Sequence, residues 1–140
     1  MTNLSEILPH QGSMLLLDEI VSCTEESLTA RVTIRESSTF FRDDGVPSWV
    51  GIEYLAQAVA AWAGKRGGGP QVGFLLGVKK YTASHPVFSL GTTLTIEVRA
   101  RDKHDNLGIF EGRIEAPDVS AQGVISVYQG EPPGLTEEKK

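Results

Sequence analysis

The sequence predicts an α+β domain in which an antiparallel β-sheet curls around a single apolar helix. Its 140 residues match the size of one domain with its own hydrophobic core. One long stretch, Trp49 to Lys65, is rich in alanine and contains no proline, as a helix requires. Segments in which apolar and polar residues alternate occur on both sides of it, and such segments are typical of half-buried strands.

The expected strands follow in order along the chain. The first runs from Met14 to Ser22 and the second from Leu28 to Arg35, and residues Glu36–Val46 are expected to form a loop. After the helix, four further strands are expected at Val72–Tyr81, Thr92–Arg101, Gly108–Ile114 and Gln122–Gln129. We therefore expect one domain over residues 1–130, followed by a disordered tail over residues 131–140.

The helix is expected to be buried, because apolar residues occur on nearly all of its sides. Pro47-Ser48 precedes it, which makes Ser48 a candidate N-cap, and the run Gly67–Pro70 is expected to end it. One sheet cannot cover such a helix completely, and exposed sheet edges tend to pair with other chains. A homodimer or higher oligomer would satisfy both requirements and is therefore expected.

Composition argues against several classes of protein. The net charge is −5 and basic residues are scattered, so nucleic acid is not an expected partner. No apolar run approaches the roughly 20 residues of a membrane helix, and the N-terminal residues do not resemble a signal peptide. Cys23 is the only cysteine, so we expect a cytoplasmic protein without disulfides. Phosphate-loop, dinucleotide and paired-histidine zinc motifs are absent from the sequence, and no metal site is expected.

Glu53 is the first candidate for chemistry, because it is the only charged residue in the interior of the apolar helix. Burial among apolar neighbours would favour the protonated carboxyl, which is the form that a general acid needs. Gln57 follows one turn later on the same face and could orient this carboxyl by a hydrogen bond. A structural alternative remains open, in which Glu53 faces solvent and is stabilised by the helix dipole.

The start of the helix and one histidine are weaker candidates. Backbone N–H groups at Ser48 and Trp49 lack helical acceptors and could polarise a carbonyl group, as an oxyanion hole does. His10 lies in a loop before the first strand and could act as a base near neutral pH, although loop histidines are more often structural. His85 and His104 are expected to be solvated.

Three stretches, in order from residue 8 to about residue 100, resemble the hotdog-fold 3-hydroxyacyl-acyl-carrier-protein dehydratases of type II fatty acid synthesis. Leu8-Pro9-His10 with Leu15–Asp18 resembles the opening motif L-P-H-R-x-P-x-L-L-x-D. Val46–Gln57 resembles M-P-G-V-L-I-x-E-A-L-A-Q at the start of the central helix. Gly73–Tyr81, continued by Pro86–Gly91, resembles x-F-A-G-I-D-x-A-x-F and R-P-V-x-P-G-D. The combination of His-x-Gly-x-Met with Gly-Val-Pro-x-Trp-Val-Gly-Ile-Glu-Tyr is similar to a divergent branch found in aryl polyene pigment pathways.

The resemblance implies a role for several residues. Glu53 matches the catalytic acid of the family, and Ser48 matches the glycine whose N–H meets the thioester carbonyl. The remaining residues expected to contact substrate are Trp49, Gln57, Phe74 and Gly77.

The catalytic histidine of the family, in the motif G-H-F-P, has no match in this chain. Only Arg42–Val46 separates Phe41 from Pro47, and this segment contains no histidine. His10 is therefore the expected base, and Asp43 or Asp44 would be a weak substitute.

The resemblance thus implies a dehydratase that acts on 3-hydroxyacyl thioesters of an acyl carrier protein, in fatty acid or aryl polyene type biosynthesis. Neither elimination nor hydrolysis requires a cofactor, and none is expected. Two alternatives remain open: a thioesterase, in which one carboxylate activates water, and a non-catalytic acyl-binding partner of an active dehydratase.

Overall fold

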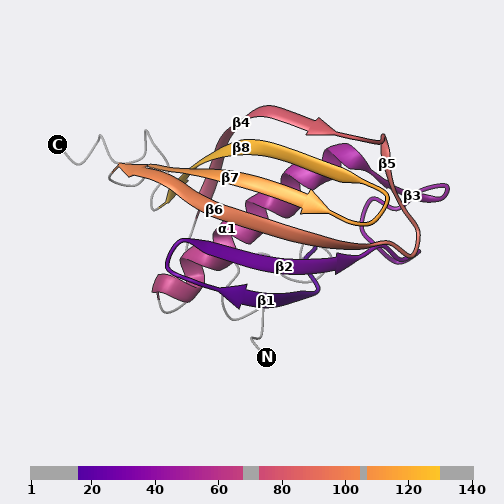
Figure 1. The fold of residues 1–140 in the computed structure, drawn as a ribbon, viewed down its shortest axis with the longest axis horizontal. Helices are drawn as coiled ribbons and strands as arrows, with labels where there is room; N and C mark the ends of the chain where they lie inside the picture. Colours follow the sequence, from indigo (N-terminus) through magenta and orange to yellow (C-terminus); the bar gives the residue numbers. More distant parts are fainter. Residues whose placement is uncertain (1–15, 68–72, 105–106, 130–140) are drawn as a thin grey trace, which may run out of the picture.

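The computed structural model describes residues 16–67, 73–104 and 107–129 (Figure 1). Its elements are the strands β1 (Glu19–Cys23), β2 (Ser27–Thr33) and β3 (Gly45–Pro47), a 3₁₀ turn (Ser48–Val50), the helix α1 (Gly51–Gly67), and the strands β4 (Gly73–Ala83), β5 (Val87–Ser89), β6 (Thr93–His104), β7 (Leu107–Glu115) and β8 (Ser120–Gln129). The expected tail at residues 131–140 lies outside the described residues.

Six strands form one antiparallel sheet in the order β1-β2-β6-β7-β8-β4. Figure 1 shows α1 crossing one face of this sheet, and α1 contacts five of its strands: β2, β4, β6, β7 and β8. The predicted architecture, an antiparallel sheet around one central helix, is therefore confirmed. β1 and β4 are the edge strands.

Apolar and polar residues alternate along the strands, and the apolar ones form the core. In β6, Leu94, Ile96 and Val98 are fully buried against α1, whereas Thr95 and Arg99 face away. Neighbouring strands supply matching apolar residues, because β2 pairs Leu28 with Val98, Ala30 with Ile96 and Val32 with Leu94. Each fully buried side chain of this kind stabilises the fold by about 1.5–3 kcal/mol.

The helix lies close to the sheet because small residues face each other. Ala58 and Ala61 are completely buried on α1. A Cβ atom at Gly112 of β7 would lie 2.8 Å from Leu55 Cδ2, so only glycine leaves room for the Leu55 side chain. The prediction of a largely buried helix is therefore confirmed, although Ile52, Glu53, Ala56 and Ala60 are only half-buried.

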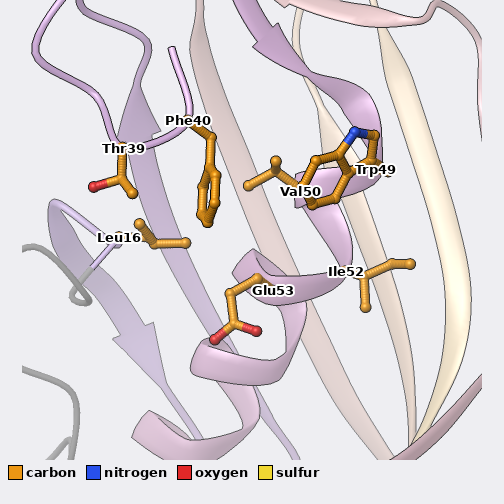
Figure 2. Close-up of a pocket in the computed structure, with 7 residues that line it drawn as sticks. All are labelled: Leu16, Thr39, Phe40, Trp49, Val50, Ile52 and Glu53. Carbon is orange, nitrogen blue, oxygen red and sulfur yellow. The ribbon is translucent and has the colours of Figure 1, made fainter.

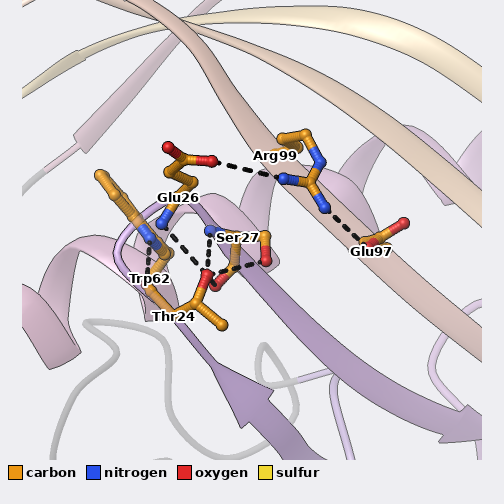
Figure 3. Close-up of polar contacts among 6 residues, drawn as sticks. All are labelled: Thr24, Glu26, Ser27, Trp62, Glu97 and Arg99. Atoms are coloured by element: carbon orange, nitrogen blue, oxygen red, sulfur yellow. Dashed lines mark hydrogen bonds and ion pairs between the residues drawn. The ribbon is translucent and has the colours of Figure 1, made fainter.

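The far end of α1 is attached to the turn between β1 and β2 (Figure 3). Thr24 Oγ1 accepts hydrogen bonds from the N–H groups of Glu26 (3.1 Å) and Ser27 (3.0 Å), which closes the turn. Trp62 Nε1 donates to the Thr24 carbonyl at 3.1 Å, and its ring meets Phe110 edge-on at 5.4 Å. The nearby ion pairs of Arg99 with Glu26 and Glu97 are exposed, and such pairs contribute little to stability.

Two short strands were not predicted. Gly45–Pro47 (β3) pairs with Val87–Ser89 (β5), so the expectation that the loop continues through Val46 is wrong. A strand of three residues is too short for a readable alternation, and this one forms only because its partner returns from about 40 residues away.

The start of the helix also differs from the prediction. Ser48 is not an N-cap: it opens the 3₁₀ turn, no side chain caps that turn, and α1 begins at Gly51 instead of Trp49. Pro47 of β3 leads directly into the turn, which takes the place of a capped first helical turn. The first strand begins at Glu19, later than expected, and residues 14 and 15 lie outside the described part of the chain.

A β-bulge interrupts edge strand β4. Lys79 pairs with Val124 and Thr82 with Gln122, so Lys80 and Tyr81 together lie opposite the single residue between those partners, Gly123. Lys80 has φ 60°, in the left-handed region that side-chain-bearing residues rarely adopt. A bulge of this kind reverses the alternation beyond it and re-aims the next side chain.

Burial along β4 confirms the reversal. Val78, Tyr81 and Ala83 pack against the core, whereas the consecutive residues Lys79 and Lys80 are both exposed. Without the extra residue, Lys80 would face the helix and Tyr81 would face solvent.

Lys80→Val is expected to lower the free energy of unfolding by about 1–2 kcal/mol, because a β-branched residue disfavours the left-handed conformation. Lys80→Gly is the matched control, since glycine adopts this φ freely and the same lysine is lost. Denaturant unfolding of both variants measures the difference. Equal stability of the two would show that the bulge is not under this constraint.

Candidate active site

An apolar cavity of about 240 Å³ opens beside the start of α1 (Figure 2). Its walls come from the segment before β1, the loop before β3, the 3₁₀ turn and the first turn of α1. The lining residues are Leu16, Thr39, Phe40, Trp49, Val50, Ile52 and Glu53. Among the described residues of this lining, Glu53 is the single ionisable side chain, and the others are apolar except for Thr39.

Glu53 lies in the first turn of α1 and is half-buried. Figure 2 shows its carboxyl projecting from the helix on the side where Leu16 and Phe40 lie, with Ile52 directed away from it. An acid in this position is also favoured by the helix dipole, as the structural alternative requires. Its place in the wall of an apolar cavity nevertheless gives it access to a bound molecule, and few polar groups in a largely apolar pocket are typical of small-molecule sites.

Two exposed aromatic residues form part of the cavity wall. The residues Phe40 and Trp49 are 47% and 56% exposed, and their ring centroids lie 5.7 Å apart in an edge-on arrangement. Phe40 has φ 72°, a costly conformation for a bulky residue. Large exposed apolar side chains beside a cavity are characteristic of a binding surface.

Gln57 is completely buried one turn after Glu53. Its Oε1 accepts a hydrogen bond from the Leu16 N–H at 2.9 Å, across 41 residues of sequence. This bond anchors the segment that supplies Leu16 to the cavity, so Gln57 shapes the site through its wall. A direct role of Gln57 toward Glu53 or substrate stays a prediction.

The two candidate amides at the start of the helix differ. The Ser48 N–H donates to the Pro86 carbonyl at 2.8 Å, so the expectation that this amide is free is wrong. The pairing of β3 with β5 causes this, because it brings Pro86 opposite Ser48. Trp49 is the second residue of the turn, where an N–H has no intrahelical acceptor, so its amide can meet a ligand.

Tyr81 contacts the same region from β4. Its hydroxyl donates to the Ser48 carbonyl at 2.7 Å, and burial raises the pKa of Tyr81 to about 12. The buried hydroxyl of Tyr54, one position after Glu53, likewise has a raised pKa, mainly through burial. Both phenols therefore stay protonated near neutral pH.

Of the other predicted site residues, those that the structure describes do not line this cavity. His10 lies outside the described residues, as does the Phe74 side chain. Gly77 is in β4 opposite Ser126, next to a register shift, and does not line the cavity. Asp43 and Asp44 are exposed. Substrate contacts of Phe74 and Gly77, and catalysis by His10, stay predictions.

Sequence reasoning missed Phe40, Thr39 and Tyr81. The adjacent aromatic residues Phe40-Phe41 within an otherwise polar loop were the available signal for the first of these. His85 is exposed, as predicted, and its Nδ1 lies 2.8 Å from Ser84 Oγ.

No group of three or more histidine, cysteine, aspartate or glutamate residues that could hold a metal ion occurs among the described residues. In the same part of the chain, no helix has the length and apolar character needed to cross a lipid bilayer.

Solved structures with a similar fold include a dehydratase heterocomplex. The dehydratase heterocomplex ApeI:P from Xenorhabdus doucetiae matches with a TM-score of 0.86 and 28% identity, covering 94% of this chain and 93% of that chain. The PaaI protein from the phenylacetic acid degradation operon of Escherichia coli has a TM-score of 0.63 and 16% identity, covering 79% and 81%. The virulence protein Cj0977 from Campylobacter jejuni has a TM-score of 0.69 and 17% identity, covering 92% and 96%. The last two show the fold alone, and together the matches confirm the expected hotdog fold.

Sequence comparison agrees with the structural match. No curated protein sequence is significantly similar to this chain. The family model of the ApeP dehydratases, however, matches residues 2–138, which is nearly the whole chain. The protein therefore belongs to the ApeP-like dehydratase family, a divergent branch of the hotdog dehydratases of the aryl polyene type.

Proposed function

We propose that the protein is a hydro-lyase that removes water from 3-hydroxyacyl thioesters carried by an acyl carrier protein. The observation that supports this most directly is the position of Glu53 in the wall of an apolar cavity at a helix start, where it is the single ionisable group among the lining residues that the structure describes. An acyl chain fits such a lining, and a carboxyl at its wall can reach a polar group near the thioester.

The proposed reaction is an elimination across C2 and C3. The Trp49 N–H polarises the thioester carbonyl, which makes the C2 proton more acidic. A base takes that proton, the C2–C3 double bond forms, and the C3–O bond breaks. Glu53 donates its proton to the departing hydroxyl, which leaves as water. Transfer of the C2 proton from the base to Glu53 then restores the starting state.

His10 is the proposed base. It precedes Leu16 by six residues, and Leu16 is held in the cavity wall by Gln57. Six residues of chain span at most about 20 Å, so this connection limits how far His10 can lie from Leu16.

A second candidate function is a subunit that works with a partner dehydratase. The related ApeI:P structure is a heterocomplex, and this chain lacks the G-H-F-P histidine. A homodimer remains the alternative assembly. In either assembly, an edge strand such as β4 offers unpaired backbone groups to the neighbouring subunit.

Mass spectrometry of a 3-hydroxyacyl carrier protein after incubation with the pure protein tests the proposal. We expect the intact carrier species to lose one water. Release of free acid would instead identify a thioesterase. An unchanged substrate, with a sample shown to be folded, would contradict an autonomous dehydratase. Water loss only after addition of a second dehydratase subunit would then support the partner function.

A further inference from the structure

We propose that Tyr81 is a positioning residue of this site, whose hydroxyl fixes the Ser48 carbonyl and thereby the direction of the helix start that carries Trp49 and Glu53. The inference deepens the proposed dehydration and rests on it for its kinetic consequences. Its structural consequence, an ordered helix start, is independent of the reaction.

Both backbone polar groups of Ser48 are held from outside the helix. The Tyr81 hydroxyl donates to the Ser48 carbonyl at 2.7 Å, and the Ser48 N–H donates to the Pro86 carbonyl at 2.8 Å. Tyr81 belongs to β4 and Pro86 directly precedes β5, so two separate segments hold the two consecutive peptide groups that meet at Ser48. Two hydrogen bonds with different directions restrict rotation of the 3₁₀ turn, and the Trp49 N–H follows immediately.

Three features of the chain converge to place the hydroxyl there. The bulge at Lys80 turns the Tyr81 side chain toward the helix. Gly123 of β8 lies beneath the tyrosine, where an added Cβ would be 3.2–3.4 Å from Tyr81 atoms. At Gly51, the first residue of α1, an added Cβ would overlap the Tyr81 hydroxyl. Of these three features, the space at Gly51 is the one that the hydroxyl itself occupies.

The hydroxyl is a constant donor. Burial raises the pKa of Tyr81 to about 12, so the phenol keeps its proton across the pH range of an assay. No ionisable side chain forms a hydrogen bond or ion pair with it among the described residues, and its acceptor is a backbone carbonyl. Tyr81 therefore contributes geometry and no titration of its own to a pH profile between about pH 6 and 9.

Loss of the Tyr81 hydroxyl should affect the reaction rate more than substrate binding, because different residues of the cavity serve these two purposes. Leu16 and Phe40 line the cavity from segments other than the helix start that Tyr81 holds, so ground-state binding of an acyl chain should persist without its hydroxyl. The Trp49 amide and the Glu53 carboxyl act on the reacting atoms, and small misplacements of such groups lower the rate strongly.

Tyr81→Phe removes only the hydroxyl and tests the inference. We expect kcat for dehydration to fall about 10- to 100-fold, with KM unchanged within about three-fold and no shift of the pH profile. Trp62→Phe is the matched control, because it also deletes one side-chain donor to a backbone carbonyl, at the other end of α1. The control is expected to lose stability while keeping kcat.

Hydrogen exchange of residues 48–53 gives a readout that needs no turnover. We expect faster exchange there in Tyr81→Phe, with the exchange of β6 and β7 unchanged. Unchanged exchange of residues 48–53 and unchanged kcat would overturn the inference. Faster exchange throughout the sheet with a matching loss of stability would also overturn it, because Tyr81 would then be merely structural. If wild type does not dehydrate the substrate, the proposed function fails, whereas local exchange still decides the role of Tyr81.

Discussion

Glu53→Gln is expected to lower kcat for dehydration by about 10²- to 10⁴-fold, which is the usual contribution of a general acid. The amide has nearly the same shape as the carboxyl but cannot donate an acidic proton to the departing hydroxyl. Glu53 is half-buried at the cavity wall, so the neutral glutamine is readily accommodated. Conversion of the 3-hydroxyacyl carrier protein to the enoyl form, followed by mass spectrometry over time, measures the effect.

The control for this variant is Glu111→Gln, which makes the same exchange on the opposite side of the sheet. Glu111 is exposed, at 56%, and its contact with Arg101 is a long one of 3.8 Å. We expect wild-type turnover from this control. A folded Glu53→Gln protein with turnover close to wild type would show that another group protonates the leaving hydroxyl, and the structural alternative for Glu53 would then hold.

Phe88→Ala is expected to lower the free energy of unfolding by about 3–5 kcal/mol, the usual cost of deleting a fully buried aromatic ring. Phe88 is completely buried in β5 and stacks on Tyr54 of α1, with ring centroids 6.2 Å apart. It also pairs with Val46 of β3, directly before the turn that begins the site. Because domains are stable by only about 5–15 kcal/mol, this loss is a large fraction of the total.

Denaturant unfolding of two further variants tests whether the loss of stability comes from the burial of the deleted ring. Phe40→Ala deletes the same ring at a position that is 47% exposed, so its cost should be below about 1 kcal/mol. Phe88→Leu keeps an apolar side chain in the core and should cost less than Phe88→Ala. Similar losses for Phe88→Ala and Phe40→Ala would contradict the placement of Phe88 in the core.

The main elements of the fold could be predicted because each has a local pattern. The alternation in Leu28–Arg35 and Thr92–Arg101 indicates strands, and β2 and β6 occupy most of these ranges. The alanine-rich stretch indicates a buried helix, which the structure places two residues later, at Gly51–Gly67. Glu53 was identifiable by the same reasoning, since one charge within an apolar helix contrasts with all its neighbours.

The details of the site depend on contacts between distant segments. Pairing of β3 with β5 engages the Ser48 amide and leaves the next one, that of Trp49, as the candidate donor. The loop that carries Phe40 has no periodicity that would indicate which residue reaches the cavity.

The bulge in β4 shows most clearly which features the local sequence pattern predicts and which depend on tertiary contacts. Along the chain, Lys79-Lys80-Tyr81 reads as two surface lysines followed by one aromatic residue, and strict alternation assigns the wrong face to the tyrosine. The left-handed turn at Lys80 and the space at Gly51 and Gly123 direct its hydroxyl to Ser48. Periodic burial along one segment is a local property that residue order specifies. A bulge, a short strand or a cavity wall instead depends on which remote backbone lies opposite, and only the folded chain brings those partners together.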